Sequence, residues 1–111
     1  MPIVNTNGSD DPISLSLSEV YGHRITTIIT IDKKDSAPLQ GNFKNHIIGT
    51  NKSLVGKRVL ISTDTLKFTP TSDTQVDYSL KGASSQQDDS DKSQFGDGMP
   101  TVGHYINYHF I

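Results

Sequence analysis

The sequence predicts a small all-β protein, an antiparallel β-sandwich of about six to seven strands with immunoglobulin-like or jelly-roll-like architecture. Short runs of alternating apolar and polar residues recur along the chain, and no segment carries an amphipathic helical pattern. Only 32% of the residues are hydrophobic, and Ser, Thr, Asn, Asp and Gly, which favour turns, fill much of the rest. The 111 residues correspond to a single domain, residues 1–111.

The first third of the chain predicts two strands. Residues 1–12 are polar and rich in turn formers, so we expect a flexible arm there. Residues 13–18 alternate Ile or Leu with Ser, which is typical of a half-buried strand. Residues 24–32 carry Ile and Thr on both faces, and this density of β-branched side chains predicts a central strand.

The middle of the chain predicts two further strands separated by turns. Residues 33–41 are expected to form a loop, residues 42–49 a weaker strand and residues 51–56 a turn. Residues 57–68 form a long alternating run in which the parity of the apolar residues shifts between Ile61 and Leu66. Such a shift predicts a β-bulge or kink near residues 63 and 64.

The last third predicts two strands around a long polar segment. Residues 76–80 alternate and predict a half-buried strand. Residues 83–100 are the longest polar stretch, and we expect a long flexible loop there, before the last strand. Residues 102–111 alternate again and predict that last strand.

Aromatic residues crowd the last strand, and they are the interface candidates of the sequence: Tyr105, Tyr108 and Phe110. An aromatic terminal strand should be packed, either in the core of its own domain or against another subunit. Because a small domain needs most of its aromatic side chains for its own core, the first alternative is favoured.

Four carboxylates in the polar segment are weak candidates for a calcium site, namely Asp88, Asp89, Asp91 and Asp97. Calcium prefers six to eight oxygen ligands, which clustered aspartates on a loop can supply. The EF-hand pattern is not met, because its glycine position would fall on Gln94. The competing interpretation is a solvated connection, so we expect no cofactor other than this weak calcium candidate.

No catalytic constellation is recognisable, and we expect that the protein is not an enzyme. The last strand carries His104 and His109, whose odd spacing places them on opposite faces. There is no Gly-x-Ser-x-Gly nucleophile motif, and Glu19 is the single glutamate. No residue is therefore assigned a catalytic role, and a small hydrolase using Asp and His is the least favoured alternative.

Charge and composition narrow the classes of partner. The net charge of −2 and the scattered Lys and Arg argue against nucleic-acid binding. No run is long enough to cross a membrane, so membrane insertion is not expected. The chain begins without the pattern of a signal peptide, which leads us to expect a cytoplasmic protein or one exported by a non-classical route. It has no cysteine, which excludes disulfides and thiolate metal sites but does not fix the compartment.

The remaining hypothesis is a non-catalytic β-sandwich module that binds a protein partner or assembles with copies of itself, plausibly as a homo-oligomer. A virion or secretion-apparatus component, a second copy of the chain and a cell-surface glycan are the partner classes that the pattern leaves open. Loops on a rigid β-scaffold and unpaired edge strands are the surfaces that such modules use. The alternative is a calcium-dependent or glycan-binding, lectin-like module.

Overall fold

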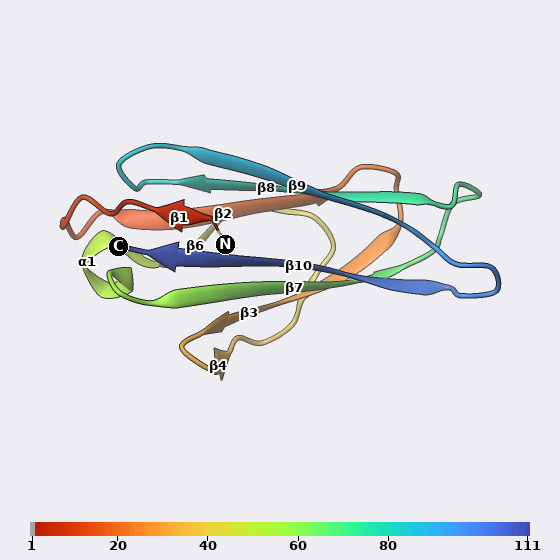
Figure 1. Ribbon diagram of the computed structural model, residues 1–111, viewed down its shortest axis with the longest axis horizontal. Helices are drawn as coiled ribbons and strands as arrows, with labels where there is room; N and C mark the ends of the chain where they lie inside the picture. The colour runs from red at the N-terminus through yellow and green to blue at the C-terminus, as the bar shows by residue number, and fades with distance from the viewer. Residues whose placement is uncertain (1) are drawn as a thin grey trace.

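A computed structural model describes residues 2–111 and confirms the β-sandwich (Figure 1). One sheet has the order β1-β10-β7-β3-β4, with β5 also paired to β3, and the other has the order β6-β2-β8-β9. The elements are β1 (Ile3–Val4), β2 (Pro12–Glu19), β3 (Arg24–Ile31), β4 (Lys34–Asp35), β5 (Leu39–Gln40), β6 (Phe43–Thr50), α1 (Asn51–Leu54), β7 (Arg58–Leu66), β8 (Asp73–Lys81), β9 (Gln87–Gln94) and β10 (Thr101–Phe110).

The likeness to immunoglobulin domains stops at the architecture. Immunoglobulin sheets pair their strands in the orders ABED and CFG. Here the chain changes sheet at most of its connections, and β8–β9 is the hairpin that joins two long neighbouring strands within one sheet. The sandwich is elongated, with principal extents of 47 × 24 × 22 Å.

Six of the long strands lie where alternation predicted them, and the expected loop at residues 33–41 contributes the two-residue strands β4 and β5. In β2, Ile13, Leu15 and Leu17 are buried while the serines between them face outward. No helix among residues 2–111 has the length and apolarity needed to span a membrane.

The predicted bulge in the long strand β7 is wrong. Its register with β3 and with β10 runs without a break through Thr63 and Asp64. The inward face simply changes in character, because Val59 and Ile61 are followed at the same parity by the buried Thr63 and Thr65. The shift of apolar parity marks the point where the interior of the sandwich becomes polar.

The predicted flexible loop at residues 83–100 is also wrong for its central part, because residues 87–94 form β9. This strand contains no apolar residue, so hydrophobic alternation could not reveal it. Its inward positions are filled by Asp89 and Asp91, which accept hydrogen bonds from Tyr108 and His104 of β10. Polar partners supplied by the opposite sheet replace the apolar burial that usually fixes a strand.

The N-terminal segment is docked rather than a free arm. Residues 3 and 4 form β1, which runs parallel to β10, and Val4 is buried. The main-chain N–H and the hydroxyl of Thr6 both donate to the carbonyl of Ile111 at 2.8 Å. These bonds join the two ends of the chain.

The expected turn at residues 51–56 contains a single helical turn, α1. Thr50 caps it, since its hydroxyl accepts from the N–H of Ser53 while the Ser53 hydroxyl accepts from the N–H of Thr50. The Asn51 side chain is fully buried, accepts from the N–H of Asn7 and donates to the carbonyls of Asp11 and Gly82. One amide therefore joins the β1–β2 connection and the residue after β8 to α1 at this end of the sandwich.

Gly82 shows how closely these segments approach, and it provides a stability test. Its φ is +101°, and a Cβ there would collide with the carbonyl oxygen of Pro12. We expect Gly82→Ala to destabilise the fold by about 3 kcal/mol, from positive φ and the clash together. The control Gly41→Ala has φ +74° and open space around it, so about 1 kcal/mol is expected. Equal losses in urea unfolding would contradict this packing.

Candidate binding surface

The most polar part of the interior is a hydrogen-bonded chain of four side chains that crosses between the sheets. The Thr74 hydroxyl donates to Glu19 Oε2 at 2.8 Å and lies 3.1 Å from His104 Nε2. His104 Nδ1 lies 2.8 Å from Asp91 Oδ2. The Thr74 hydroxyl thus lies between the Glu19 carboxyl and the His104 ring. Glu19, Thr74 and His104 are buried, and Asp91 is part-exposed.

Glu19 also fixes the loop between β2 and β3. Its Oε1 accepts the main-chain N–H groups of Tyr21 and His23 at 2.8 and 2.9 Å. Its Oε2 accepts a further, longer bond from the N–H of Gln75 in addition to that of Thr74. A buried carboxylate with four donors needs no cationic partner in contact with it, and here it holds the turn in one conformation.

His23 fixes the loop between β7 and β8 in the same way. Its Nε2 donates to the carbonyl of Asp73 at 2.9 Å, and its Nδ1 accepts the N–H of Phe68 at 3.1 Å. Only the neutral tautomer with the proton on Nε2 satisfies both bonds, because a carbonyl accepts and an amide donates. The ring also packs edge-on against Phe95 of the β9–β10 loop, with the centroids 4.8 Å apart.

Three connections therefore meet at one end of the sandwich, which we call the loop end: residues 20–23, 67–72 and 95–100 (the right-hand side of Figure 1). Main-chain bonds add to the side-chain contacts, since the N–H of Lys67 donates to Pro100 and that of Phe95 to Ser72. The loop end is thus a rigid platform although it is made of loops.

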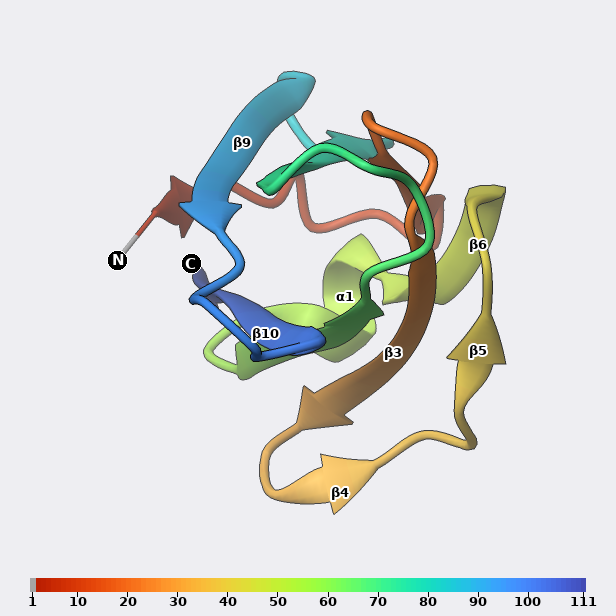
Figure 2. The same cartoon turned by 90° about the vertical axis from the view of Figure 1, so that its right-hand side faces the viewer.

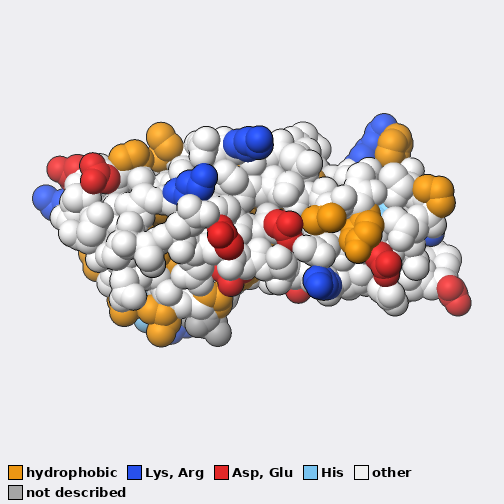
Figure 3. All heavy atoms as spheres, turned by 90° about the horizontal axis from the view of Figure 1, so that it is seen from above, with side chains coloured by type: hydrophobic (Ala, Val, Ile, Leu, Met, Phe, Trp, Pro, Cys, Tyr) orange, Lys and Arg blue, Asp and Glu red, His pale blue; other side chains and the backbone are white. Residues whose placement is uncertain are grey.

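The loop end carries a cluster of solvent-exposed apolar side chains. Five of the large hydrophobic residues with high exposure lie on these loops or at the adjoining end of β7, and they are Val20, Tyr21, Leu66, Phe68 and Met99. In Figure 3 hydrophobic side chains are visible near this end and also near the opposite end of the molecule. The Phe68 ring, 61% exposed, is held by the guanidinium of Arg24, 4.2 Å from its centroid. Exposed apolar groups on fixed loops are typical of a recognition surface.

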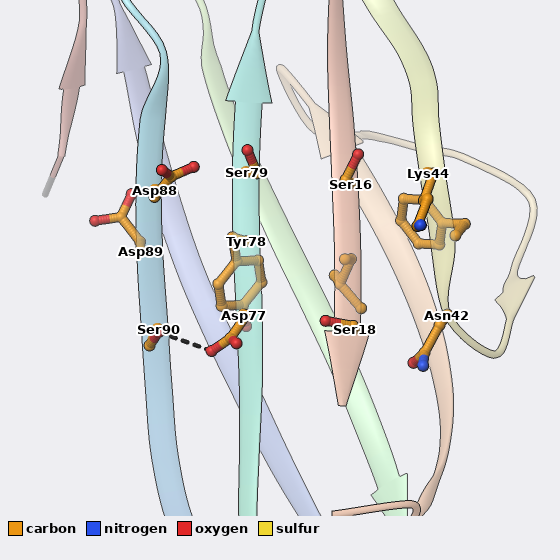
Figure 4. A pocket seen from close by; sticks show the side chains of 12 residues that line it. Ser16, Ser18, Asn42, Lys44, Asp77, Tyr78, Ser79, Asp88, Asp89 and Ser90 are labelled. Carbon is orange, nitrogen blue, oxygen red and sulfur yellow. Dashed lines mark hydrogen bonds between the residues drawn. The ribbon is translucent and has the colours of Figure 1, made fainter. Parts of the chain in front are cut away.

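A second surface is a groove of about 700 Å³ on the outer face of the sheet β6-β2-β8-β9 (Figure 4). Residues of all four strands line it, among them Ser16, Ser79 and Ser90, with Phe43 and Lys44 from β6. Several of its groups are already satisfied by one another, since Asp77 Oδ1 accepts from both Ser90 and Gln75. These internal bonds leave fewer free donors and acceptors for a ligand.

Asp88 lines this groove and keeps its negative charge down to low pH. Hydrogen bonds from the Gln86 amide, and then from the Ser79 hydroxyl, lower the pKa of its carboxyl below the ordinary value of 3.8. The group is fully exposed, so this effect concerns its charge and not the stability of the fold.

The four calcium candidates do not converge. Asp89 and Asp91 point toward β10, strand alternation places Asp88 on the opposite face of β9, and Asp97 lies in the β9–β10 loop. Within residues 2–111 no group of three or more His, Asp or Glu side chains is placed to hold a metal ion.

The three interface candidates separate in the same way. Tyr108 and Phe110 are fully buried in the core of their own domain, and Tyr105 is 64% exposed on the outer face of the other sheet. Its ring lies over Gly103, where a Cβ would come within 2.7 Å of the Tyr105 hydroxyl oxygen. The core explanation for the aromatic strand is therefore confirmed for two of the three residues.

The order Asp91–His104–Thr74 resembles the relay that activates a hydroxyl nucleophile. In this protein the hydroxyl is 1% exposed and its proton is directed to Glu19, so a substrate has no access to it. The burial and hydrogen bonds of these three side chains support a structural role for them.

No family model, curated protein or solved structure matches the chain. Sequence reasoning missed the loop end, because Phe68 fits the alternating run of residues 57–68, while Val20, Tyr21 and Met99 lie in separate segments that only the fold brings together.

The buried hydrogen bonds of Thr74 predict that Thr74→Val strongly destabilises the fold. Valine has the same shape but leaves Glu19 Oε2 and His104 Nε2 without the hydroxyl between them, so we expect a loss of about 3 kcal/mol in the free energy of unfolding. The control variant Thr101→Val alters an exposed threonine and should change the free energy of unfolding by less than about 0.5 kcal/mol. Similar losses for the two variants in denaturant titrations would show that these buried hydrogen bonds do not stabilise the fold.

The buried tyrosines predict a loss of stability in alkali. Burial raises the pKa of Tyr108 above its ordinary value of 10.0, and the Asp89 carboxylate raises it further. Burial and then Asp91 act on Tyr78 in the same direction. Above about pH 10 the unfolded chain releases protons that the folded chain retains, so the free energy of unfolding falls as the pH rises.

Urea titrations from about pH 9 to about pH 12 check this dependence. The free energy of unfolding should fall less steeply with pH in Tyr108→Phe, because this variant removes one of the two retained protons. An unchanged slope in this variant would contradict the assignment.

Proposed function

We propose that this protein is a non-catalytic recognition module whose loop end docks into an apolar pocket of a protein partner. The observation that carries the proposal is the exposure of Val20, Tyr21, Phe68 and Met99 on fixed loops. Glu19 and His23 fix the first two loops, and main-chain bonds to Ser72 and Lys67 fix the loop of Met99. Fixed loops lose little conformational entropy on binding, so most of the free energy gained by burying these side chains contributes to affinity.

The side chains at the loop end are of the kind that dominates binding energy. Aromatic residues are enriched at hot spots, and methionine adapts its shape to a partner's pocket. Polar and charged residues such as Arg24, Lys67 and Asp97 surround the cluster and would form the rim of the interface.

The groove on the outer sheet face is the alternative surface, and a glycan would be its ligand. The groove is supported less well, because Asp77 and Asp88 accept hydrogen bonds from neighbouring side chains. Its two aromatic rings are not freely exposed to stack on a sugar, since Tyr78 is 1% exposed and Phe43 is half-buried against the core.

Site-specific photocrosslinking tests the proposal in cells of the source organism. A benzoylphenylalanine at Phe68 or Met99 should give one discrete protein adduct, and one at Tyr105, which is equally exposed on a sheet face, should give none. Val20→Ser with Tyr21→Ser should reduce the adduct at position 68 by about tenfold or more, since these side chains share the interface.

Circular dichroism melting of the double variant provides the control, because exposed side chains should change stability little. Equal adducts from positions 68 and 105, or none from 68 and 99, would overturn the proposal. Adducts with lipid alone would show that the loop end contacts a membrane surface instead.

A further inference from the structure

His23 joins two of the connections at the loop end through a ring that can gain a proton. Figure 2 looks onto the loop end, where the β2–β3 and β7–β8 connections lie side by side. The ring is buried, and its nitrogens bond to the β7–β8 connection and to Asp73, the first residue of β8. The hydrogen bonds of the loop end therefore include a side chain type that changes its charge near physiological pH.

The Nδ1 atom of His23 accepts from the main chain of the β7–β8 connection. The N–H of Phe68 donates to it at 3.1 Å, and the N–H of Thr69 makes a longer bond at 3.4 Å. The Thr69 hydroxyl is also 3.4 Å from Nδ1, but its proton goes to the carbonyl of Tyr21 at 3.0 Å. Two main-chain donors thus point at a nitrogen that must carry no hydrogen.

A second proton on the ring conflicts with these bonds. An imidazolium carries a hydrogen on both nitrogens and donates from both. The bond from Nε2 to the carbonyl of Asp73 would remain, because this nitrogen already donates. The hydrogen on Nδ1 would face the N–H groups of Phe68 and Thr69, and all of these donors would lose their partner. Protonation of His23 and the observed position of the β7–β8 connection therefore oppose each other.

No carboxylate contacts the ring to offset this conflict. Within residues 2–111, His104–Asp91 is the one ion pair closer than 4.0 Å, so neither nitrogen of His23 lies beside a carboxylate oxygen. The buried Glu19 carboxylate accepts the main-chain N–H of His23 and three further donors, so both of its oxygens are already occupied. The positive charge of a protonated ring would therefore lack a hydrogen-bonded counter-charge.

The other charged groups on the segments around the ring act from outside these contacts. The Asp73 carboxylate accepts from the Gln94 amide at 2.8 Å. Arg24 lies over the Phe68 ring, and its positive charge disfavours a second cation nearby. Water screens the exposed titratable side chains of the same segments, which are Tyr21, Lys67 and Asp97. The hydrogen bonds at Nδ1 therefore decide how the loop end responds to a proton on this ring.

We propose that His23 is a pH-sensitive switch that holds the loop end in place when neutral and releases it when protonated. The neutral ring fixes the main chain of Phe68 and Thr69 against the β2–β3 connection. The protonated ring frees this main chain, and the exposed Phe68 side chain is then no longer presented in one position. The consequence for binding rests on the proposed function of the loop end: acid weakens the complex with the partner. The switch itself is a property of the free protein.

The direction of the effect follows from proton linkage. The released state binds one proton more than the closed state wherever its free ring is protonated. A histidine with free nitrogens is protonated below about pH 6.5. The equilibrium constant for release therefore rises by up to about tenfold for each pH unit below that value, and it does not depend on the protonation of His23 above it.

Amide hydrogen exchange of the free protein tests the switch. After correction for intrinsic exchange rates, the protection of the Phe68 and Thr69 amides should fall about tenfold between about pH 6 and about pH 5. The Gly56 amide donates to the carbonyl of Phe110 at the opposite end of the sandwich and should keep its protection. NMR shifts of the ring nitrogens of His23 near neutral pH should show the proton on Nε2 and none on Nδ1.

Histidine variants assign the effect to one ring. His23→Gln keeps a group that donates and accepts but gains no proton in this range, so the protection of the Phe68 amide should become independent of pH. His46→Gln and His109→Gln replace histidines on β6 and β10 and should leave the pH dependence unchanged. If His23→Gln fails to fold, the ring NMR shifts and these two variants still decide the question.

The switch is wrong if the protection of Phe68 does not change with pH in the native protein or still changes in His23→Gln. A proton on Nδ1 near neutral pH would also exclude it, as would loss of the pH dependence in His46→Gln or His109→Gln.

Photocrosslinking in extracts of the source cells separates the switch from the proposed function. The adduct from benzoylphenylalanine at Met99 should be weaker at about pH 5 than at about pH 7, and in His23→Gln it should be equal at both. Equal adducts in the native protein would exclude the regulatory role. The expected exchange behaviour without an adduct at any pH would overturn only the docking of the loop end, whereas a strong adduct with pH-independent exchange would overturn only the switch.

Discussion

The buried hydrogen-bonded chain from Glu19 through Thr74 and His104 to Asp91 is the constraint around which this sandwich is organised. It joins three strands of one sheet to the last strand of the other, through an interior that elsewhere is packed with Val, Ile and Leu. A buried polar network is stabilising only when each member is satisfied, so the sheets can pack in one relative position. The polar strand β9 belongs to the fold because of this network.

The same principle fixes both ends of the molecule. At the loop end, Glu19 and His23 collect main-chain groups from two connections and pack against the third. At the opposite end, the Asn51 amide joins two segments, the β1–β2 connection and the residue after β8. Buried side chains that bond to loop main chain give rigid loops without disulfides, which a chain lacking cysteine could not form.

The loop end is the surface at which we propose that this protein recognises a partner. It presents apolar side chains on a fixed main chain. Binding there would insert these side chains into a partner. It requires no chemistry from Asp91, His104 and Thr74, whose hydrogen bonds lie inside the protein.

The sequence by itself determined the fold class, six long strands and the aromatic character of β10, because alternation with period two directly reports burial of one face. It also placed His104 and His109 on opposite faces of the last strand, from their odd spacing. It misjudged β7 at residues 63 and 64 and the whole of β9, where the inward positions carry Thr and Asp. Burial of those residues depends on hydrogen-bond partners from distant strands, and only the tertiary structure decides which partners meet. The loop end likewise arises from contacts between segments far apart in the chain, which no local pattern records.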